Sequence, residues 1–286
     1  MKQHARLVMS YFASKLSPVL GPDARRYLLM VDGTPVVMPF QLRWLLPAVC
    51  RGSFTRWWVV WLLSFPLAAA GMVWWAVAAG HGWAAGAAAG VLLVGLSGLL
   101  GVKPVETALP SMALGVLSAA AFAQGWWPLG LAFAVLAATI RESAPVWIFL
   151  WVWNPIALAA LAAPAFRWVL HRPHMDEVTA GSGVLCQVHD HPVWQALVHQ
   201  DGRWRDAYLV VVPWGVTIAA LYRPSWQLGV LLAVTYAQLL VTTDYTRLLH
   251  TAAGPAMALG AAVVIPVEWL ALAVLVHVVW WRPPPR

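Results

Sequence analysis

Long apolar runs separated by short polar turns dominate this sequence and leave little choice of fold. They lie approximately at Trp57–Ala79, Trp83–Gly101, Ala108–Gln124, Trp126–Ile140, Ala144–Phe166, Ala207–Tyr222, Trp226–Thr243, Leu248–Ile265 and Val267–Trp281. Within a bilayer the backbone must satisfy its own hydrogen bonds, so apolar runs of roughly 17–25 residues are typical of spanning helices. Transmembrane strands are excluded because the runs do not alternate. The pattern predicts an all-α polytopic transmembrane bundle with eight or nine spans, because only Pro266 separates the last two runs.

The composition agrees with a membrane protein. Of 286 residues, 61% are hydrophobic and 10% are charged, whereas a soluble domain has about 25% charged residues. The net charge of +7 comes from Lys and Arg at the ends of the apolar runs, where such residues meet anionic headgroups. No nucleic-acid-binding motif accompanies the charge. We therefore expect membrane lipid, and no nucleic acid, as a partner.

The polar regions divide the chain into five parts. Residues 1–56 form a basic segment that we expect to lie along the membrane as interfacial helices. Residues 57–166 hold a five-span bundle, residues 167–206 form a polar, histidine-rich loop, and residues 207–281 hold three or four further spans. Residues 282–286 are a tail.

Counting the runs places several charged segments on one side of the bilayer. Two runs separate residues 1–56 from the turn at Lys103–Glu106, and two more separate that turn from Arg141–Glu142. All three segments should therefore face the same side, and the loop at 167–206, which follows the fifth run, should face the other. The ionisable residues that this argument gathers are Asp23, Asp32, Arg43, Glu106, Arg141 and Glu142. Such residues are either membrane anchors or a site for an anionic, lipid-linked substrate.

Several of these segments carry a family resemblance. The stretch VETALPSMALGVLSAAAFAQGWW at 105–127, followed by TIRES at 139–143, resembles the GT-C superfamily of polytopic membrane glycosyltransferases. In that superfamily an acidic residue opens one span, and a basic–Glu–Ser/Thr turn follows the next pair. DARRY at 23–27 and PFQLRWLLP at 39–47 look like the first-loop sequence of several bacterial members. TDYTRLL at 243–249, followed by AAGP at 252–255, looks like a late-span motif.

The resemblance implies an inverting sugar transfer from a polyprenyl-phosphate-linked donor, in a plasma membrane of the bacterial type. Asp23 would act as the base or would position the acceptor, and Glu106 would occupy the second acidic position. The residues that would contact the substrate are Arg43, Arg141, Glu142 and Lys103. Arg43 or Arg141 would pair with the donor phosphate, which suits a guanidinium fork. A divalent metal ion could bind near the carboxylates.

Other polar groups leave different functions open. Cys186, His189 and His191 stand close together in the histidine-rich loop, where they form either a zinc or transition-metal site or a solvated loop. Glu268 and His277 would suit a proton relay in a small transporter, although no inverted repeat supports transport. The alternative to the enzyme is therefore a non-enzymatic multi-pass protein, such as a lipid-binding or assembly component, or a small transporter.

Three local patterns predict features of the bundle itself. Tryptophans at the run ends indicate an aromatic belt at the membrane surface, with a ligand cage as the alternative; they are Trp57-Trp58, Trp74-Trp75, Trp83, Trp126-Trp127 and Trp280-Trp281. Gly86 and Gly90 form a GxxxG pair, which predicts close helix packing inside the protein. Asn154 precedes Pro155, which predicts a helix kink bridged by the amide side chain.

Overall fold

The computed structural model describes residues 22–31, 42–51, 53–99, 105, 107–170, 225–239 and 251–272. Within these ranges the regular elements are all helical, as predicted. The elements are α2 (Pro22–Val31), α3 (Leu45–Cys50), α4 (Phe54–Ala78), α5 (Gly82–Leu99), α6 (Ala108–Ala123), α7 (Trp127–Ile140), α8 (Ala144–Val152), the 3₁₀ helix η2 (Pro155–Leu161), α9 (Ala162–Leu170), α14 (Trp226–Leu239) and α16 (Gly254–Val264). Residues 267–272 are also helical.

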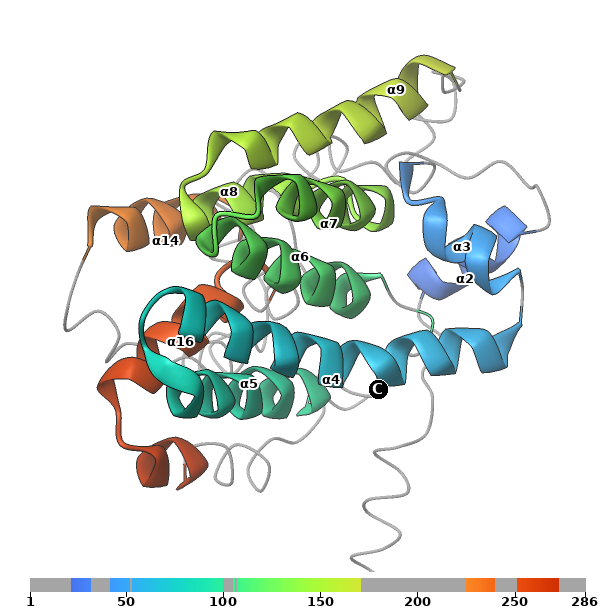
Figure 1. Cartoon of the computed structure of the whole chain (residues 1–286). Coiled ribbons are helices and arrows are strands. Elements are labelled where there is room, and N and C mark those ends of the chain that lie inside the picture. The colour runs from blue at the N-terminus through green and yellow to red at the C-terminus, as the bar shows by residue number, and fades with distance from the viewer. Residues whose placement is uncertain are drawn as a thin grey trace, which may run out of the picture.

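Helices α4 to α7 run up and down beside one another and form the centre of the molecule (Figure 1). Their bounds agree closely with the predicted apolar runs, because glycines end those runs. Gly80 and Gly82 lie between α4 and α5, Gly125 lies between α6 and α7, and all three have φ near +80°. Only glycine adopts that backbone conformation without steric cost, so the short turns reverse the chain at these points.

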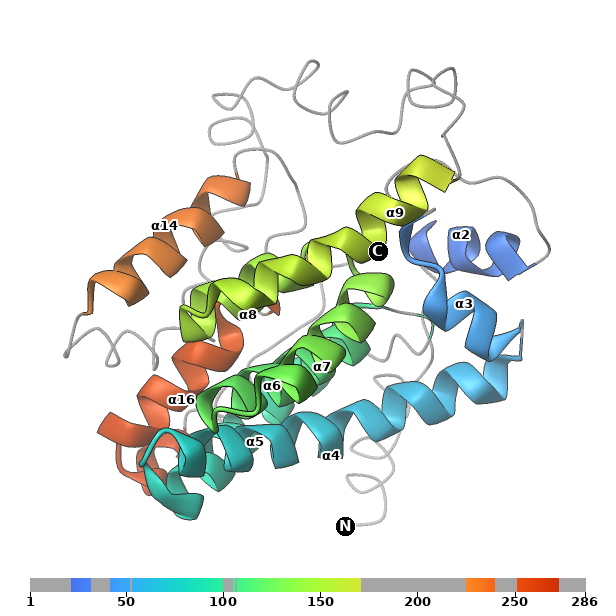
Figure 2. The same ribbon diagram turned by 45° about the horizontal axis from the view of Figure 1, so that its top comes forward.

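The two ends of this bundle carry different kinds of residue. The charged end holds Arg43, Arg141 and Glu142, and α2 and α3 lie at that end (Figures 1 and 2). The tryptophan end holds Trp126 and Trp83, at the start of α7 and near the start of α5. Helix α4 starts at the charged end and finishes at the tryptophan end.

The predicted Gly86–Gly90 contact lies between α5 and α4. A Cβ atom added at Gly86 would lie 2.5 Å from Val73 Cα and 2.9 Å from Ala76 Cβ. One added at Gly90 would lie 3.1 Å from Ala69 Cα. The absence of side chains at both positions lets the two backbones approach each other, so the motif serves packing within the chain.

We expect Gly86→Ala to destabilise the bundle by about 1–3 kcal/mol, because the new methyl group meets backbone atoms that cannot move aside. Gly229→Ala is the matched control, since a Cβ at Gly229 in α14 would meet no atom within 4 Å. Thermal unfolding of the detergent-solubilised protein measures both changes. Equal midpoints for the two variants would show that α4 and α5 do not pack in this way.

The run Ala144–Phe166, which was predicted to be one span, is a helical hairpin. α8 ends at Trp153, which adopts a left-handed conformation with φ 54°, and η2 begins directly afterwards. Proline disfavours helical backbone in the residue before it, and Asn154 Oδ1 accepts a hydrogen bond from the Ile156 N–H at 3.0 Å. Asn154 therefore caps a returning helix, and the predicted kink is a full reversal.

This reversal changes the end of the bundle at which the polar loop starts. α8 leaves the charged end, and η2 with α9 runs back to it (Figure 2). Arg167, in the last turn of α9, lies over the ring of Trp44 with its guanidinium carbon 6.0 Å from the ring centroid. The prediction that the loop at 167–206 leaves from the side opposite Arg43 is therefore wrong, because the fifth run reverses at Trp153 and returns to the charged end.

The last two predicted spans are separate helices where the structure describes them. Ile265 at the end of α16 has extended backbone with ψ 133°, and helix resumes at Val267. Pro266 cannot continue the hydrogen-bonding ladder of α16 because it has no N–H. Pro266 therefore separates two helices, one ending at Val264 and the next beginning at Val267.

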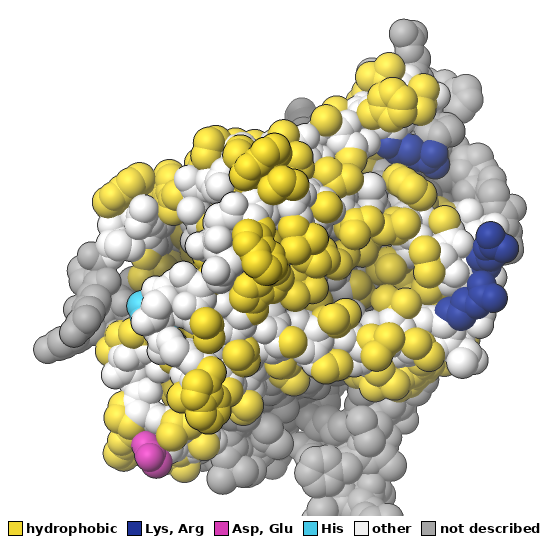
Figure 3. Space-filling model, in the orientation of Figure 1, with side chains coloured by type: hydrophobic (Ala, Val, Ile, Leu, Met, Phe, Trp, Pro, Cys, Tyr) yellow, Lys and Arg dark blue, Asp and Glu magenta, His cyan; other side chains and the backbone are white. Residues whose placement is uncertain are grey.

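The outer surface of the bundle is apolar. Exposed apolar side chains lie on most of the helices, including Val59, Leu62, Leu63, Val91, Leu136, Phe166, Val230 and Val263. They cover most of the face in Figure 3, whereas the described Lys and Arg side chains gather at one edge of it. Within the described residues, α4 is the one helix that is both long and apolar enough to cross a membrane, with a mean hydropathy of 1.7.

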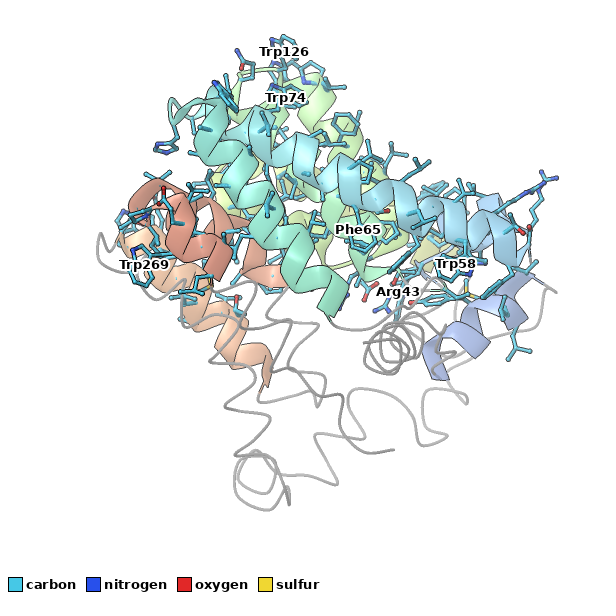
Figure 4. The ribbon with its side chains drawn as sticks, turned by 90° about the horizontal axis from the view of Figure 1, so that it is seen from below. Arg43, Trp58, Phe65, Trp74, Trp126 and Trp269 are labelled. Carbon is cyan, nitrogen blue, oxygen red and sulfur yellow. The ribbon has the colours of Figure 1, made fainter. Side chains whose placement is uncertain are left out.

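The predicted tryptophan belt divides into two groups. Trp83, Trp126 and Trp127 are more than half exposed, as a belt requires. Trp57 and Trp75 are buried in the bundle and contribute to its core. Trp74 packs against Trp126 with the ring centroids 5.7 Å apart, and Figure 4 shows the two rings together. Position at a run end did not distinguish core tryptophans from surface ones, because adjacent residues on a helix face different directions. Trp280 and Trp281 lie outside the described residues.

Candidate functional site

The polar cluster at the charged end is built on an ion pair between two segments that are far apart in sequence. Arg43 precedes α3, and Glu142 lies in the turn between α7 and α8. The guanidinium of Arg43 donates from Nε to Glu142 Oε2 and from Nη2 to Glu142 Oε1, both at 2.7 Å. This bidentate geometry is the strongest form of the Arg–carboxylate pair. Figure 4 shows Arg43 beside the first turns of α4.

A tyrosine and a threonine extend the cluster. Arg43 Nη1 donates to the hydroxyl oxygen of Tyr27 at 3.0 Å, and that hydroxyl lies 3.0 Å from Thr107 Oγ1. Because Tyr27 accepts from the guanidinium, its own hydrogen is available to Thr107. Tyr27 and Thr107 are almost completely buried. The network therefore ties α2 and the segment before α3 to the starts of α6 and α8.

The two charges of the pair stabilise each other. Burial opposes the charge on Arg43, but the interactions with Tyr27 and Glu142 outweigh that effect and raise the pKa of Arg43 above its ordinary value. Burial alone would raise the pKa of Glu142, but the adjacent charge of Arg43 and its hydrogen bonds lower this pKa below its ordinary value. Both groups are thus charged at neutral pH.

We expect the protein to lose stability when the solution is acidified. The folded-state pKa of Glu142 is lowered, so its contribution is complete above the unfolded-state pKa of about 4.3 and is lost as the pH falls through the folded value. Glu142→Gln removes the titrating group and should flatten this part of the pH dependence. Thermal unfolding midpoints of both proteins between neutral and acidic pH test this expectation. Parallel curves for the two proteins would contradict it.

A small apolar cluster surrounds the network. Tyr27 packs against Trp57 with ring centroids 6.1 Å apart, and Leu46, Val105 and Ile140 complete the contact. Cys50 is fully buried in the same cluster, and burial raises the pKa of its thiol to about 11, despite a lowering effect of Arg56. Cys50 is therefore a packing residue with little thiolate at neutral pH.

Arg141 lies next to the pair but faces a different space. It is buried and lines a narrow cavity of about 10 Å³ together with Ser111, Thr251, Trp147 and Trp151. A cavity of this size holds no more than about one water molecule. Arg141 also helps to lower the pKa of Glu142 through its charge. The two adjacent residues of the turn thus face different surroundings.

The sequence-predicted residues divide into those the structure brings together and those it does not describe. Arg43, Arg141 and Glu142 lie together at the charged end, where counting the runs placed them. Asp23 lies in α2, but its side chain is outside the described part. Lys103, Glu106, Cys186, His189 and His191 also lie outside the described residues, as do Asp32 and His277. Among the described residues, no group of three or more His, Cys, Asp or Glu side chains is placed to hold a metal ion.

Sequence reasoning missed Tyr27 and Thr107. Both are uncharged, and each stands directly beside a motif, since Tyr27 ends DARRY and Thr107 follows Glu106. The sequence signal for these two residues was their position beside the motifs. The sequence argument selected ionisable residues, so it included their charged neighbours and omitted these two uncharged ones. No family model, curated protein or solved structure matches this chain.

Proposed function

We propose that the chain is a multi-pass membrane glycosyltransferase of the GT-C type that uses a polyprenyl-phosphate-linked sugar donor. Its apolar outer surface would lie in a plasma membrane of the bacterial type, with α4 to α7 as crossing helices. The hairpin of α8, η2 and α9 would enter and leave from the charged end, because the nine residues of α8 extend only about 14 Å. The predicted eight or nine crossings are reduced accordingly.

The observation that carries the proposal is the cluster of Arg43, Arg141 and Glu142 at one end of an apolar bundle. Ionisable residues at the edge of a membrane region are costly to bury and so favour a functional role. The cluster also unites the segments that resemble the superfamily, namely residues 39–47, 105–127 and 139–143. Val105 and Thr107, the neighbours of Glu106, are buried at this end.

In this proposal the two arginines have different roles. Three nitrogen atoms of Arg43 already contact Glu142 and Tyr27, so Arg43 serves as a positioning residue that holds the first loop against the turn. Arg141, which lines the narrow cavity, would pair with the donor phosphate. Since its cavity holds about one water molecule at most, donor binding would require neighbouring side chains to move. Asp23 and Glu106 keep the roles that the resemblance implies for them.

A second candidate function is lipid binding without catalysis. The specific observation in its favour is the closed pair of Arg43 and Glu142, in which the guanidinium fork contacts protein groups. Such a pair can serve solely to fix the structure. The bundle would then bind or organise membrane lipid in an assembly.

The test uses purified protein in liposomes with radiolabelled polyprenyl-phosphate-linked sugars and an extract of potential acceptors. If the protein is the proposed glycosyltransferase, it should bind the donor and release polyprenyl phosphate. Asp23→Ala and Glu106→Ala should abolish release and spare binding, whereas Arg141→Ala should weaken binding. Arg56→Ala is the control, because Arg56 is exposed at the start of α4. Binding without release in the unsubstituted protein would favour the second candidate, and absence of both would exclude the glycosyltransferase.

A further inference from the structure

A second, larger cavity lies away from the charged cluster. It has a volume of about 390 Å³, is partly open to the outside, and is lined by the end of α4 and by α8, α14 and α16. This volume is within the range of small-molecule binding sites, roughly 300–1,000 Å³. Its apolar walls include Trp75, Trp151, Leu231 and Leu259. These residues belong to the main core, so the cavity reaches into the centre of the bundle.

The polar side chains of this cavity are few and come from two segments that are far apart in the sequence. They are His81, in the turn before α5, and Ser225 and Gln227, at the start of α14. All three are exposed. Each carries a hydrogen-bond donor. The cavity therefore has apolar walls and a rim that can hydrogen-bond to acceptor oxygens.

The cavity also reaches the apolar outside of the bundle. Val263 and Val264 line it from α16, and both are exposed on the outer surface. The exposed part of the cavity wall is therefore partly apolar. Trp151 lines both this cavity and the narrow cavity at Arg141, and its Nε1 donates to the Ala252 carbonyl at 2.5 Å.

We propose that this cavity binds one hydrocarbon chain of a membrane lipid, whose oxygen-bearing headgroup contacts His81, Ser225 and Gln227. The apolar walls suit a hydrocarbon chain, the polar rim suits its headgroup, and the exposed Val263 and Val264 would face the lipid. The proposal rests on the membrane location proposed above, and it is independent of sugar transfer. The chain could belong to a phospholipid or to a polyprenyl carrier, which share this chemistry.

Photo-crosslinking in lipid nanodiscs tests the site with two probes, a phosphatidylglycerol with a diazirine on its acyl chain and a polyprenyl phosphate with a diazirine near its end. Peptide mass spectrometry then maps the attached probe. We expect attachment at cavity-facing residues of α14 and α16, such as Leu231 and Leu259. The probe that attaches there identifies the source of the chain.

Gly260→Phe fills the cavity, which Gly260 lines, and should reduce this attachment about tenfold or more, since displacing even two methylene groups has that effect on affinity. Gly229→Phe is the matched control, because Gly229 lies on α14 with open space around it. Ala256→Leu provides a milder filling of the same cavity if Gly260→Phe does not fold.

Equal attachment in the filled and control proteins, or attachment spread evenly over all outward-facing helices, would overturn the proposal, because the probe would then be reporting the surrounding lipid. The sugar-transfer assay is separate from this measurement. A protein that binds the chain and transfers no sugar would retain the cavity site and lose the enzyme proposal. A protein that transfers sugar without chain attachment here would do the reverse.

Discussion

Glu142→Ala or Arg43→Ala should destabilise the protein by about 3–5 kcal/mol, because each variant leaves the opposite charge without its partner. The pair is bidentate at 2.7 Å, and the Arg43 side chain is only 10% exposed. Arg43 would lose both contacts with Glu142, and Tyr27 alone cannot replace a carboxylate. Unfolding by denaturant in a detergent micelle measures the change.

The double variant Arg43→Met with Glu142→Met distinguishes an ion-pair effect from general loss of packing. Replacement of both charges by apolar groups should cost less than either single alanine substitution, since no charge is left buried. Arg56→Ala, at an exposed position, should change stability by no more than about 0.5 kcal/mol. Additive losses in the double variant would show that the two residues do not interact.

Accessibility labelling of introduced cysteines should distinguish a hairpin at residues 144–170 from a single membrane crossing. In a protein with Cys50→Ala and Cys186→Ser, single cysteines are introduced at Arg56, Leu170 and Gln124 and exposed to a membrane-impermeant maleimide. Arg56→Cys marks the charged end, and Gln124→Cys marks the tryptophan end, after α6. Because the chain reverses at Trp153, Leu170→Cys should react from the same side as Arg56→Cys.

A single crossing by this run would give a different labelling pattern. If Ala144–Phe166 crossed the membrane once, Leu170→Cys would react from the side of Gln124→Cys. All three native positions are exposed, so poor reaction would not result from burial in the protein. Labelling after permeabilisation shows that each thiol is able to react. Reaction of all three from one side would instead show that α4 to α6 do not traverse the bilayer.

The helices were largely predictable from the sequence because apolar runs and glycine turns are local signals. Helix α4 and α6 begin and end within a few residues of the predicted bounds. The location of Arg43 and Glu142 at one end followed from counting the runs between them, whereas their ion pair was not predicted. That argument needed only an even number of helical runs in between, and α4 to α7 are four helices.

The hairpin could not be inferred in the same way. The run containing Asn154 and Pro155 is long enough for one span, and a proline is compatible with both a kink and a reversal. The left-handed backbone at Trp153 decides between them, and no residue type at that position signals it. Likewise, hydropathy does not distinguish the buried Trp57 from the exposed Trp126, because the neighbouring helices determine which face is covered.

The Arg43–Glu142 contact also sets an order of assembly during synthesis. Its two residues are 99 positions apart, so the guanidinium leaves the ribosome long before the carboxylate that receives it. Helices α4 to α7 all lie between them. The segment that contains Arg43 therefore cannot form this ion pair until α7 has been synthesised. The charged end consequently reaches its final structure at a late stage of biogenesis.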